Sequence, residues 1–230
     1  MRRFIHSHLS PLFFLFFLIL FLLLLLLFIF GLPLAFEELG IPGMLAIYLL
    51  FFSFIGSTVN IPVKTWFIKH PSMADRVRFW GITYSIPRMK EDTMVLSINL
   101  GGAIIPLVIV FYQFFRIIIV FQSASMLLQV LFATSLTTLL CYFIARPVKG
   151  IGIAMPALIP PVSAAIVALL LSPGMPAVTA YCAGTLGTLI GADILNLSKI
   201  KKLNAPMVSI GGAGTFDGIF LSGIIAVLLV

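Results

Sequence analysis

Residues 183–193 read AGTLGTLIGAD, a run of small, hydroxyl-bearing and aliphatic residues that ends on an acid. Asp193 lies within an apolar stretch as long as a membrane span, and Asp217 follows 24 residues later within the next such stretch. A carboxylate in the hydrocarbon region of a bilayer costs at least about 2.5 kcal/mol, so it rarely occurs there without a function. These two acids are therefore the first candidates for a functional site.

The composition excludes a soluble protein. Of the 230 residues, 61% are hydrophobic and 9% are charged, and the mean hydropathy is +1.22. The net charge is +7, but the basic residues punctuate the apolar runs instead of clustering with aromatic residues. We therefore expect no nucleic-acid partner. We expect a single polytopic domain over residues 1–230, integral to the cytoplasmic (inner) membrane and surrounded by membrane lipid.

Seven apolar segments are long enough to cross a membrane. A helix needs about 20 residues to cross a hydrocarbon core about 30 Å thick. The first segment is too long for the core of a signal peptide and has no small-residue cleavage site, so we expect it to be retained as a helix. The predicted spans are 11–36, 42–59, 99–120, 124–145, 150–171, 175–198 and 205–230.

The basic residues predict how these spans are oriented. With a cytoplasmic N-terminus, 13 of the 14 Lys and Arg residues fall on the cytoplasmic side, whereas Glu37 and Glu38 fall outside. Cytoplasmic loops of membrane proteins usually carry such an excess of basic residues. Arg116 is the exception, and we expect its long side chain to reach the interface. The sequence thus predicts an all-α integral membrane protein with its N-terminus in and its C-terminus out.

Residues 60–98 form the longest connection between the predicted spans. Residues 76–79 and 82–86 alternate apolar and polar side chains around Trp80 and Gly81, which is the period of a β-strand. We expect a small β-hairpin-like loop at the cytoplasmic surface. It serves either as a connector or as a functional platform, and the sequence leaves both open.

Three segments contain residues that disfavour a plain helix. Residues 147–161 contain four prolines and two glycines, residues 209–218 carry a glycine cluster that runs into Asp217, and residues 99–106 open the third span with Gly-Gly and Pro. Non-helical backbone at membrane depth survives only where protein buries it or where it lines a water-filled cavity. We therefore expect residues 147–161 to be broken or re-entrant. The two glycine segments either pack closely against a neighbouring helix or line a functional cavity.

The predicted depths of Asp193 and Asp217 allow their side chains to meet. Asp217 precedes the C-terminus by about 20 Å of helix, and Asp193 precedes Lys199 by about 9 Å. Both acids therefore lie near the cytoplasmic face, in consecutive antiparallel spans. Asp193 lies about 180° around the helix from Gly184. Either the sixth span is packed on both sides, or Gly191 unwinds the helix and changes the face that Asp193 occupies.

Two acids held close together in a low dielectric share one proton, and aspartic proteases use such a pair to activate water. We therefore expect an intramembrane aspartyl endopeptidase that acts on transmembrane or signal-anchor peptides, with Asp193 and Asp217 as catalytic residues. Two other functions stay open. The protein is alternatively a transporter or channel that uses a buried acid as a proton or cation relay, or a scaffold whose acids pair with polar groups. The histidines and cysteines show no metal-site spacing, so we expect no metal and no cofactor.

Five stretches carry the most distinctive motifs: 57–62 (STVNIP), 99–103 (NLGGA), 146–152 (RPVKGIG), 183–193 (AGTLGTLIGAD) and 211–218 (GGAGTFDG). Together they resemble the prokaryotic membrane protein family catalogued as domain of unknown function 1614. The resemblance covers nearly the whole chain after the first span. It implies that these stretches form the signature of the family, and it brings no assigned activity.

Three shorter motifs more weakly resemble those of presenilin and the signal peptide peptidases. That class pairs Tyr-Asp with Gly-x-Gly-Asp and adds Pro-Ala-Leu, to which residues 216–217, 191–193 and 156–158 are similar. The order along the chain differs and no strict Gly-x-Gly-Asp is present, so the resemblance implies a rearranged or convergent site. We expect substrate contacts from Pro156, Ala157, Leu158, Gly191, Gly212, Gly214 and Phe216.

Overall fold

The structure is a computed structural model of the chain. It describes residues 15, 18, 19, 22, 30–71, 75–79, 82–86, 89–148, 152–200, 207–212 and 218–230. Most of the first predicted span, 11–36, lies outside these residues. So do Asp217, Phe216 and Gly214 of the predicted site.

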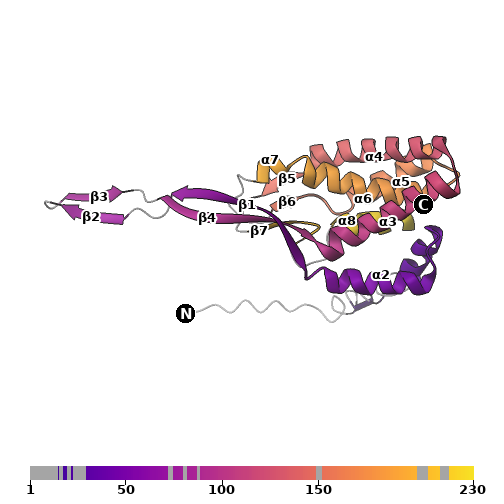
Figure 1. Cartoon of the computed structure of the whole chain (residues 1–230), viewed down its shortest axis with the longest axis horizontal. Helices are drawn as coiled ribbons and strands as arrows, with labels where there is room; N and C mark the ends of the chain where they lie inside the picture. Colours follow the sequence, from indigo (N-terminus) through magenta and orange to yellow (C-terminus); the bar gives the residue numbers. More distant parts are fainter. Residues whose placement is uncertain are drawn as a thin grey trace.

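A bundle of apolar helices makes up the larger part of the molecule, and a ribbon of strands extends from one end of it (Figure 1). The helical segments are Phe30–Glu38, α2 (Gly43–Gly56), α3 (Ile105–Phe115), α4 (Ala124–Ile144), α5 (Ile159–Leu171), α6 (Pro176–Thr188), α7 (Leu197–Ile200) and α8 (Gly218–Leu228), with π-helical turns η1 (Leu100–Ile104), η2 (Arg116–Val120) and η3 (Leu189–Ile194). The π-helical turns extend α3 at both ends and extend α6 at its C-terminal end.

Three helices in the described part of the chain are long and apolar enough to cross a membrane: Leu100–Val120, Ala124–Ile144 and Pro176–Lys199. Phe30–Glu38 and Gly43–Gly56 are together apolar enough for a fourth span. They are bent by 113° at a short break, so they count as a span only if the bent pair is taken as one. The expected seven membrane-length helices are therefore not reached in this part of the chain.

Proline and glycine account for much of the difference. The predicted span 150–171 contains a strand and a turn before its helix begins at Ile159, as the prolines of residues 147–161 predicted. Among the described residues of the predicted span 205–230, Met207–Ile210 form a strand and Gly218–Leu228 a helix. At about 1.5 Å per residue, the 13 residues of α5 are shorter than a hydrocarbon core about 30 Å thick.

The strands that the structure describes form three small sheets. The largest has the order β1-β4-β7, in which β1 (Asn60–Pro71) pairs antiparallel with β4 (Met89–Asn99), and β7 (Met207–Ile210) pairs parallel with β4. The predicted hairpin around residues 80 and 81 is present as β2 (Asp75–Phe79) paired with β3 (Ile82–Ile86). The much longer β1–β4 ribbon was not predicted, and it extends away from the bundle (Figure 1). The third sheet pairs β5 (Arg146–Val148) with β6 (Gly152–Ala154).

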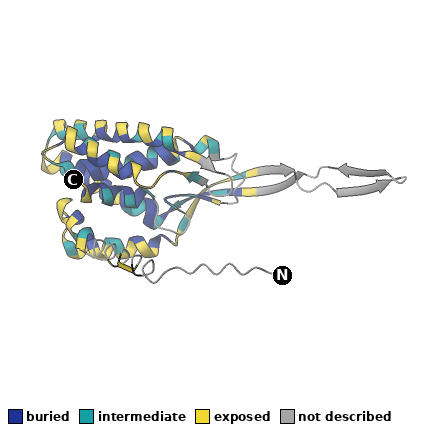
Figure 2. Ribbon diagram, turned by 180° about the vertical axis from the view of Figure 1, so that it is seen from behind, coloured by how far each residue is buried: buried dark blue, intermediate teal, exposed yellow. Residues whose placement is uncertain are grey.

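The core lies along α6, which packs against α3, α4, α5 and α8 and is mostly buried. Figure 2 shows the buried residues concentrated inside the bundle, with exposed residues along the outer faces of α2 and α4. Tyr181, Phe220 and Ile224 form one apolar cluster with Phe36 and Leu39, so the first described helix shares the core of α6 and α8. The free Cys141 and Cys182 are buried in the bundle.

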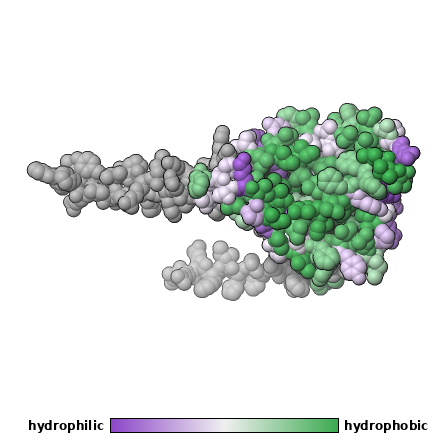
Figure 3. Space-filling view, in the orientation of Figure 1, coloured by the Kyte–Doolittle hydropathy of each residue, from purple (hydrophilic) through white to green (hydrophobic). Residues whose placement is uncertain are grey.

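The outer surface of the bundle is mostly hydrophobic, and hydrophilic residues gather at its two ends (Figure 3). Large apolar side chains such as Phe111, Phe132 and Leu170 are more than half exposed. A soluble protein rarely exposes such a continuous apolar surface. This surface and the long apolar helices fit a membrane environment.

Candidate functional site

The π-helical turns η1 and η3 lie at one end of the bundle, next to β4 and α7, where strands and helices meet (Figure 1). β4 continues directly into η1. β7 pairs with the C-terminal part of β4, from Val95↔Met207 to Ile98↔Ile210. The first residue of β1 pairs with the last residue of β4. We call this region the strand–helix junction and define it by residues 53–60, 96–103 and 207–212.

Asn99 is the polar centre of the junction, and its side chain is fully buried. Its Nδ2 donates to the carbonyl oxygen of Ser57 at 2.6 Å and to Oδ1 of Asn60 at 3.0 Å. Its Oδ1 accepts from the N–H of Gly102 at 2.7 Å, which caps the first turn of η1. Ser209 of β7 donates to Oδ1 of Asn60 at 2.6 Å. The side-chain amides of Asn99 and Asn60 together thus join three chain segments that are distant in sequence.

Glycine lets these segments approach each other closely. A Cβ on Gly101 would overlap the carbonyl oxygen of Ser53, and a Cβ on Gly102 would overlap the carbonyl oxygen of Gly211. Gly211 and Gly212 both have φ of +86°, a conformation that residues with a side chain rarely adopt. Gly101 therefore serves a backbone contact between η1 and α2, whereas Gly102 and Gly211 serve one between η1 and the end of β7.

Asp193 lies on η3, where α6 changes to π-helical geometry, and it is half-buried. Gly191 packs so closely against α4 that a Cβ would overlap the carbonyl oxygen of Thr138. Asn196 donates to the carbonyl oxygens of Gly191 and Ala192, both at 3.0 Å. The first alternative for the sixth span holds, because α6 is packed on several sides, and its helix changes from α-helical to π-helical form over Leu189–Ile194. π-Helical turns of this kind are frequent at functional sites.

A buried apolar cluster joins η3 to the chain on both sides of Asp217. Leu189 of η3, Ile210 of β7 and Ile219 of α8 belong to this cluster, together with Leu96 and Ala103 of the junction. Ile219 follows Asp217 by two residues, and Leu189 precedes Asp193 by four. The structure therefore brings together the segments that carry or flank the two acids. Asp217 itself is outside the described residues, so the meeting of the two carboxyls stays a prediction.

The Pro156–Leu158 motif connects β6 to α5 at the same end of the bundle. Ile153 of β6 packs against Met94 and Val208, which places β6 beside β4 and β7. Pro156, Ala157 and Leu158 are exposed, and Pro156 lines a surface cavity of about 510 Å³ together with Phe143, Ile144, Arg146, Ala154 and Met155. Substrate contacts at this motif, at Gly191 and at Gly212 remain predictions.

No individual role for Asn60, Asn99 or Ser209 was predicted from the sequence. An amide at the start of an apolar span, two residues before Gly-Gly, was the available signal, because a side-chain amide at that position can cap the following turn. No group of three or more His, Cys, Asp or Glu residues that could hold a metal ion occurs among the described residues.

Comparison with protein families connects this geometry to a known group of sequences. The family described as "Protein of unknown function (DUF1614)" matches residues 54–229, a range that includes nearly all of the junction, η3 and both acids. No curated protein and no solved structure matches the chain. The resemblance predicted from the five motifs is therefore confirmed, and the chain belongs to the DUF1614 family of proteins of unknown function.

Proposed function

We propose that the protein is an intramembrane aspartyl endopeptidase whose catalytic centre lies between η3 and the strand–helix junction. The supporting observation is the buried cluster of Leu189, Ile210 and Ile219. This cluster ties the helix that carries Asp193 to the chain on either side of Asp217. Asp193 and Asp217 lie four and two residues from members of this cluster. Their carboxyl groups are therefore well placed to form a catalytic pair.

In this proposal, one carboxylate of the pair is ionised and the other is protonated. The ionised carboxylate takes a proton from a water molecule, whose oxygen attacks the peptide carbonyl carbon, while the protonated one donates to the carbonyl oxygen. The tetrahedral intermediate then collapses, the C–N bond breaks and the departing amine takes up a proton. The reaction requires no metal and no cofactor.

An extended substrate segment would reach the acids through β7. β7 is the last strand in the order β1-β4-β7, as far as the structure describes the chain. Addition of a peptide strand to a sheet edge is a common way to bind extended peptides, because the main chain supplies the hydrogen bonds. The peptide would come from a transmembrane or signal-anchor segment, with Pro156–Leu158, Gly191, Gly212, Gly214 and Phe216 as further contacts.

We also propose that the chain lies in the cytoplasmic membrane with its N-terminus in and its C-terminus out. The asymmetry of the basic residues supports this orientation. The two short helices, α5 and α8, would complete seven crossings together with the non-helical segments that precede them. Such segments are stable at membrane depth where protein buries them, and the buried parts of β7 fit that requirement.

The test is cleavage of a reporter transmembrane peptide by the purified protein in liposomes. Asp193→Asn and Asp217→Asn should each reduce the cleavage rate by at least about 1000-fold, because neither acid can act alone. Asp75→Asn, the same chemical change at the start of β2, is the matched control and should leave the rate unchanged. Thermal unfolding in detergent should be similar for all three variants. Cleavage at the normal rate by either of the first two variants would contradict the proposal.

A transporter or channel is the second candidate, and the interrupted helices favour it. η1, η3 and the 113° bend between Phe30–Glu38 and Gly43–Gly56 are the kind of discontinuity at which transporters bind ions. This function predicts proton- or cation-coupled uptake into liposomes, with one of the two Asp→Asn variants affected more than the other. Loss of assembly without loss of cleavage or flux would instead indicate a scaffold.

A further inference from the structure

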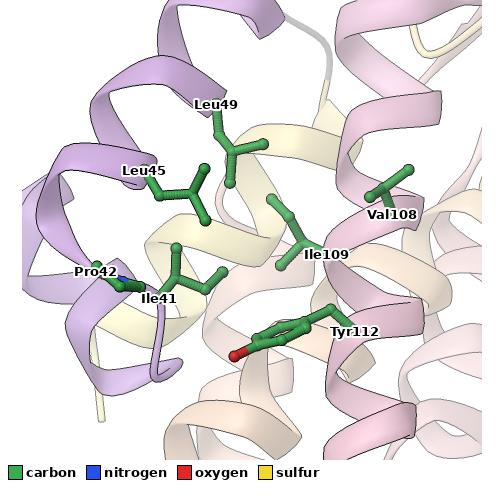
Figure 4. Close-up of a pocket in the computed structure, with 7 residues that line it drawn as sticks. All are labelled: Ile41, Pro42, Leu45, Leu49, Val108, Ile109 and Tyr112. Atoms are coloured by element: carbon green, nitrogen blue, oxygen red, sulfur yellow. The ribbon is translucent and has the colours of Figure 1, made fainter.

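An apolar groove lies between α2 and α3, away from the strand–helix junction. It has a volume of about 210 Å³ and is lined by Ile41, Pro42, Leu45, Leu49, Val108, Ile109 and Tyr112. Figure 4 shows side chains from α2, from the turn before it and from α3 gathered around the space between the two helices. A dry cavity of about 150 Å³ can accept a benzene molecule, so this groove has room for a stretch of hydrocarbon chain.

Arg116 lies one helical turn beyond Tyr112, next to the turn that precedes α2. Its Nη1 donates to the carbonyl oxygen of Leu39 and, at 3.2 Å, to Oε1 of Gln113. The Tyr112 hydroxyl donates to the carbonyl oxygen of Gly40 at 3.2 Å. The guanidinium carbon is 5.7 Å from the centre of the Tyr112 ring and 5.2 Å from that of Phe121. The cation is therefore held in place beside one end of the groove.

The hydrogen bonds of Arg116 leave part of its guanidinium group available. Both side-chain bonds use Nη1, and within the part of the chain that the structure describes no carboxylate forms an ion pair with it. Nε and Nη2 can still donate to an anion. Arginine is well suited to phosphate, because its planar group can donate two parallel hydrogen bonds.

Acidic groups lie at the end of the helix Phe30–Glu38, directly before this turn. Glu37 and Glu38 are exposed, and Oε1 of Glu37 lies 3.3 Å from the position that a Cβ on Gly43 would occupy. A purely anionic headgroup would meet these carboxylates as well as Arg116. A headgroup with a phosphate and a primary ammonium complements both charges.

We infer that this groove binds one phospholipid with an aminoalkyl phosphate headgroup. An acyl chain lies against Leu45, Leu49 and Val108, the phosphate accepts hydrogen bonds from Arg116, and the ammonium lies beside Glu37. Binding of a phosphate explains why Arg116, unlike the other basic residues, does not fall on the predicted cytoplasmic side of the membrane. It is independent of the proposed protease activity.

The test uses protein reconstituted with equal amounts of phosphatidylethanolamine and phosphatidylglycerol, followed by native mass spectrometry of the lipid that stays bound. We expect phosphatidylethanolamine to be retained preferentially. Leu45→Trp should fill the groove and reduce its retention about tenfold, the effect of losing one good contact. Leu139→Trp, at a similarly exposed position of α4, is the matched control and should change nothing.

Two charge variants test the headgroup. Arg116→Gln should reduce retention about tenfold, because one charge-assisted hydrogen bond is lost. Glu37→Gln should shift the preference toward phosphatidylglycerol. Equal retention by Leu45→Trp and Leu139→Trp overturns the groove as the site. A preference of the unmodified protein for phosphatidylglycerol overturns the headgroup assignment. The comparison of Leu45→Trp with Leu139→Trp tests lipid binding in the groove even if Arg116→Gln fails to fold.

Discussion

In the interior of the bundle, six buried alanines from α4, α5, α6 and α8 pack against one another, whereas at the strand–helix junction the buried residues are tied by hydrogen bonds. Helices in lipid gain little from the hydrophobic effect and associate through close packing of small residues. Non-helical backbone in the same environment must have its polar groups satisfied by the protein. The two regions therefore respond to substitution in different ways.

The largest effect is expected at the junction from Gly102→Ala. The added Cβ would overlap the carbonyl oxygen of Gly211, and the contact is between two backbones that cannot move aside independently. We expect a loss of stability of about 4 kcal/mol or more, seen as loss of folded protein during purification in detergent. Gly174→Ala is the control, because a Cβ there would have no neighbour within 4 Å. Equal stability of the two variants would mean that η1 and β7 are not in contact.

A smaller effect is expected from Asn99→Ala. This change removes two donated hydrogen bonds and the cap on Gly102, so buried groups lose their partners. We expect the free energy of unfolding to fall by about 2–4 kcal/mol, measured by thermal or denaturant unfolding in detergent. Ser135→Ala, at an exposed hydroxyl of α4, should change it by less than about 0.5 kcal/mol. A tolerated Asn99→Ala would show that packing alone holds the junction together.

The smallest effects are expected in the interior, from a pair of threonines on α4. The buried Thr137 hydroxyl donates to the carbonyl oxygen of Ala133 at 3.0 Å, whereas the buried Thr134 hydroxyl has no partner among the described residues. Thr137→Val should cost about 0.5–1 kcal/mol, and Thr134→Val should be neutral or slightly stabilising. The same unfolding experiment compares them directly. A destabilising Thr134→Val would indicate that its hydroxyl has a partner, such as a buried water.

Part of the site could be predicted from the sequence, because the signals are local. The non-helical backbone at residues 152–158 and 209–212 follows from proline and glycine, which disfavour a helix wherever they occur. The prediction of a function for Asp193 follows from the cost of a charge in an apolar span. The role of Asn99 could not be predicted in this way, because its partners lie 39 and 42 residues away and only folding brings them close.

The chain's apolar runs and the spacing of its basic residues determine by themselves that it is a helical membrane protein, since transfer from water to lipid depends on composition over about 20 residues. Only the tertiary structure decided that the ends of β4 and β7 meet at Gly102 and Gly211, and that Leu189, Ile210 and Ile219 share one cluster. The two glycines are 109 positions apart in the chain, and Leu189 is 21 and 30 positions from Ile210 and Ile219. These contacts depend on the shapes of neighbouring backbones, which no local property of the sequence specifies.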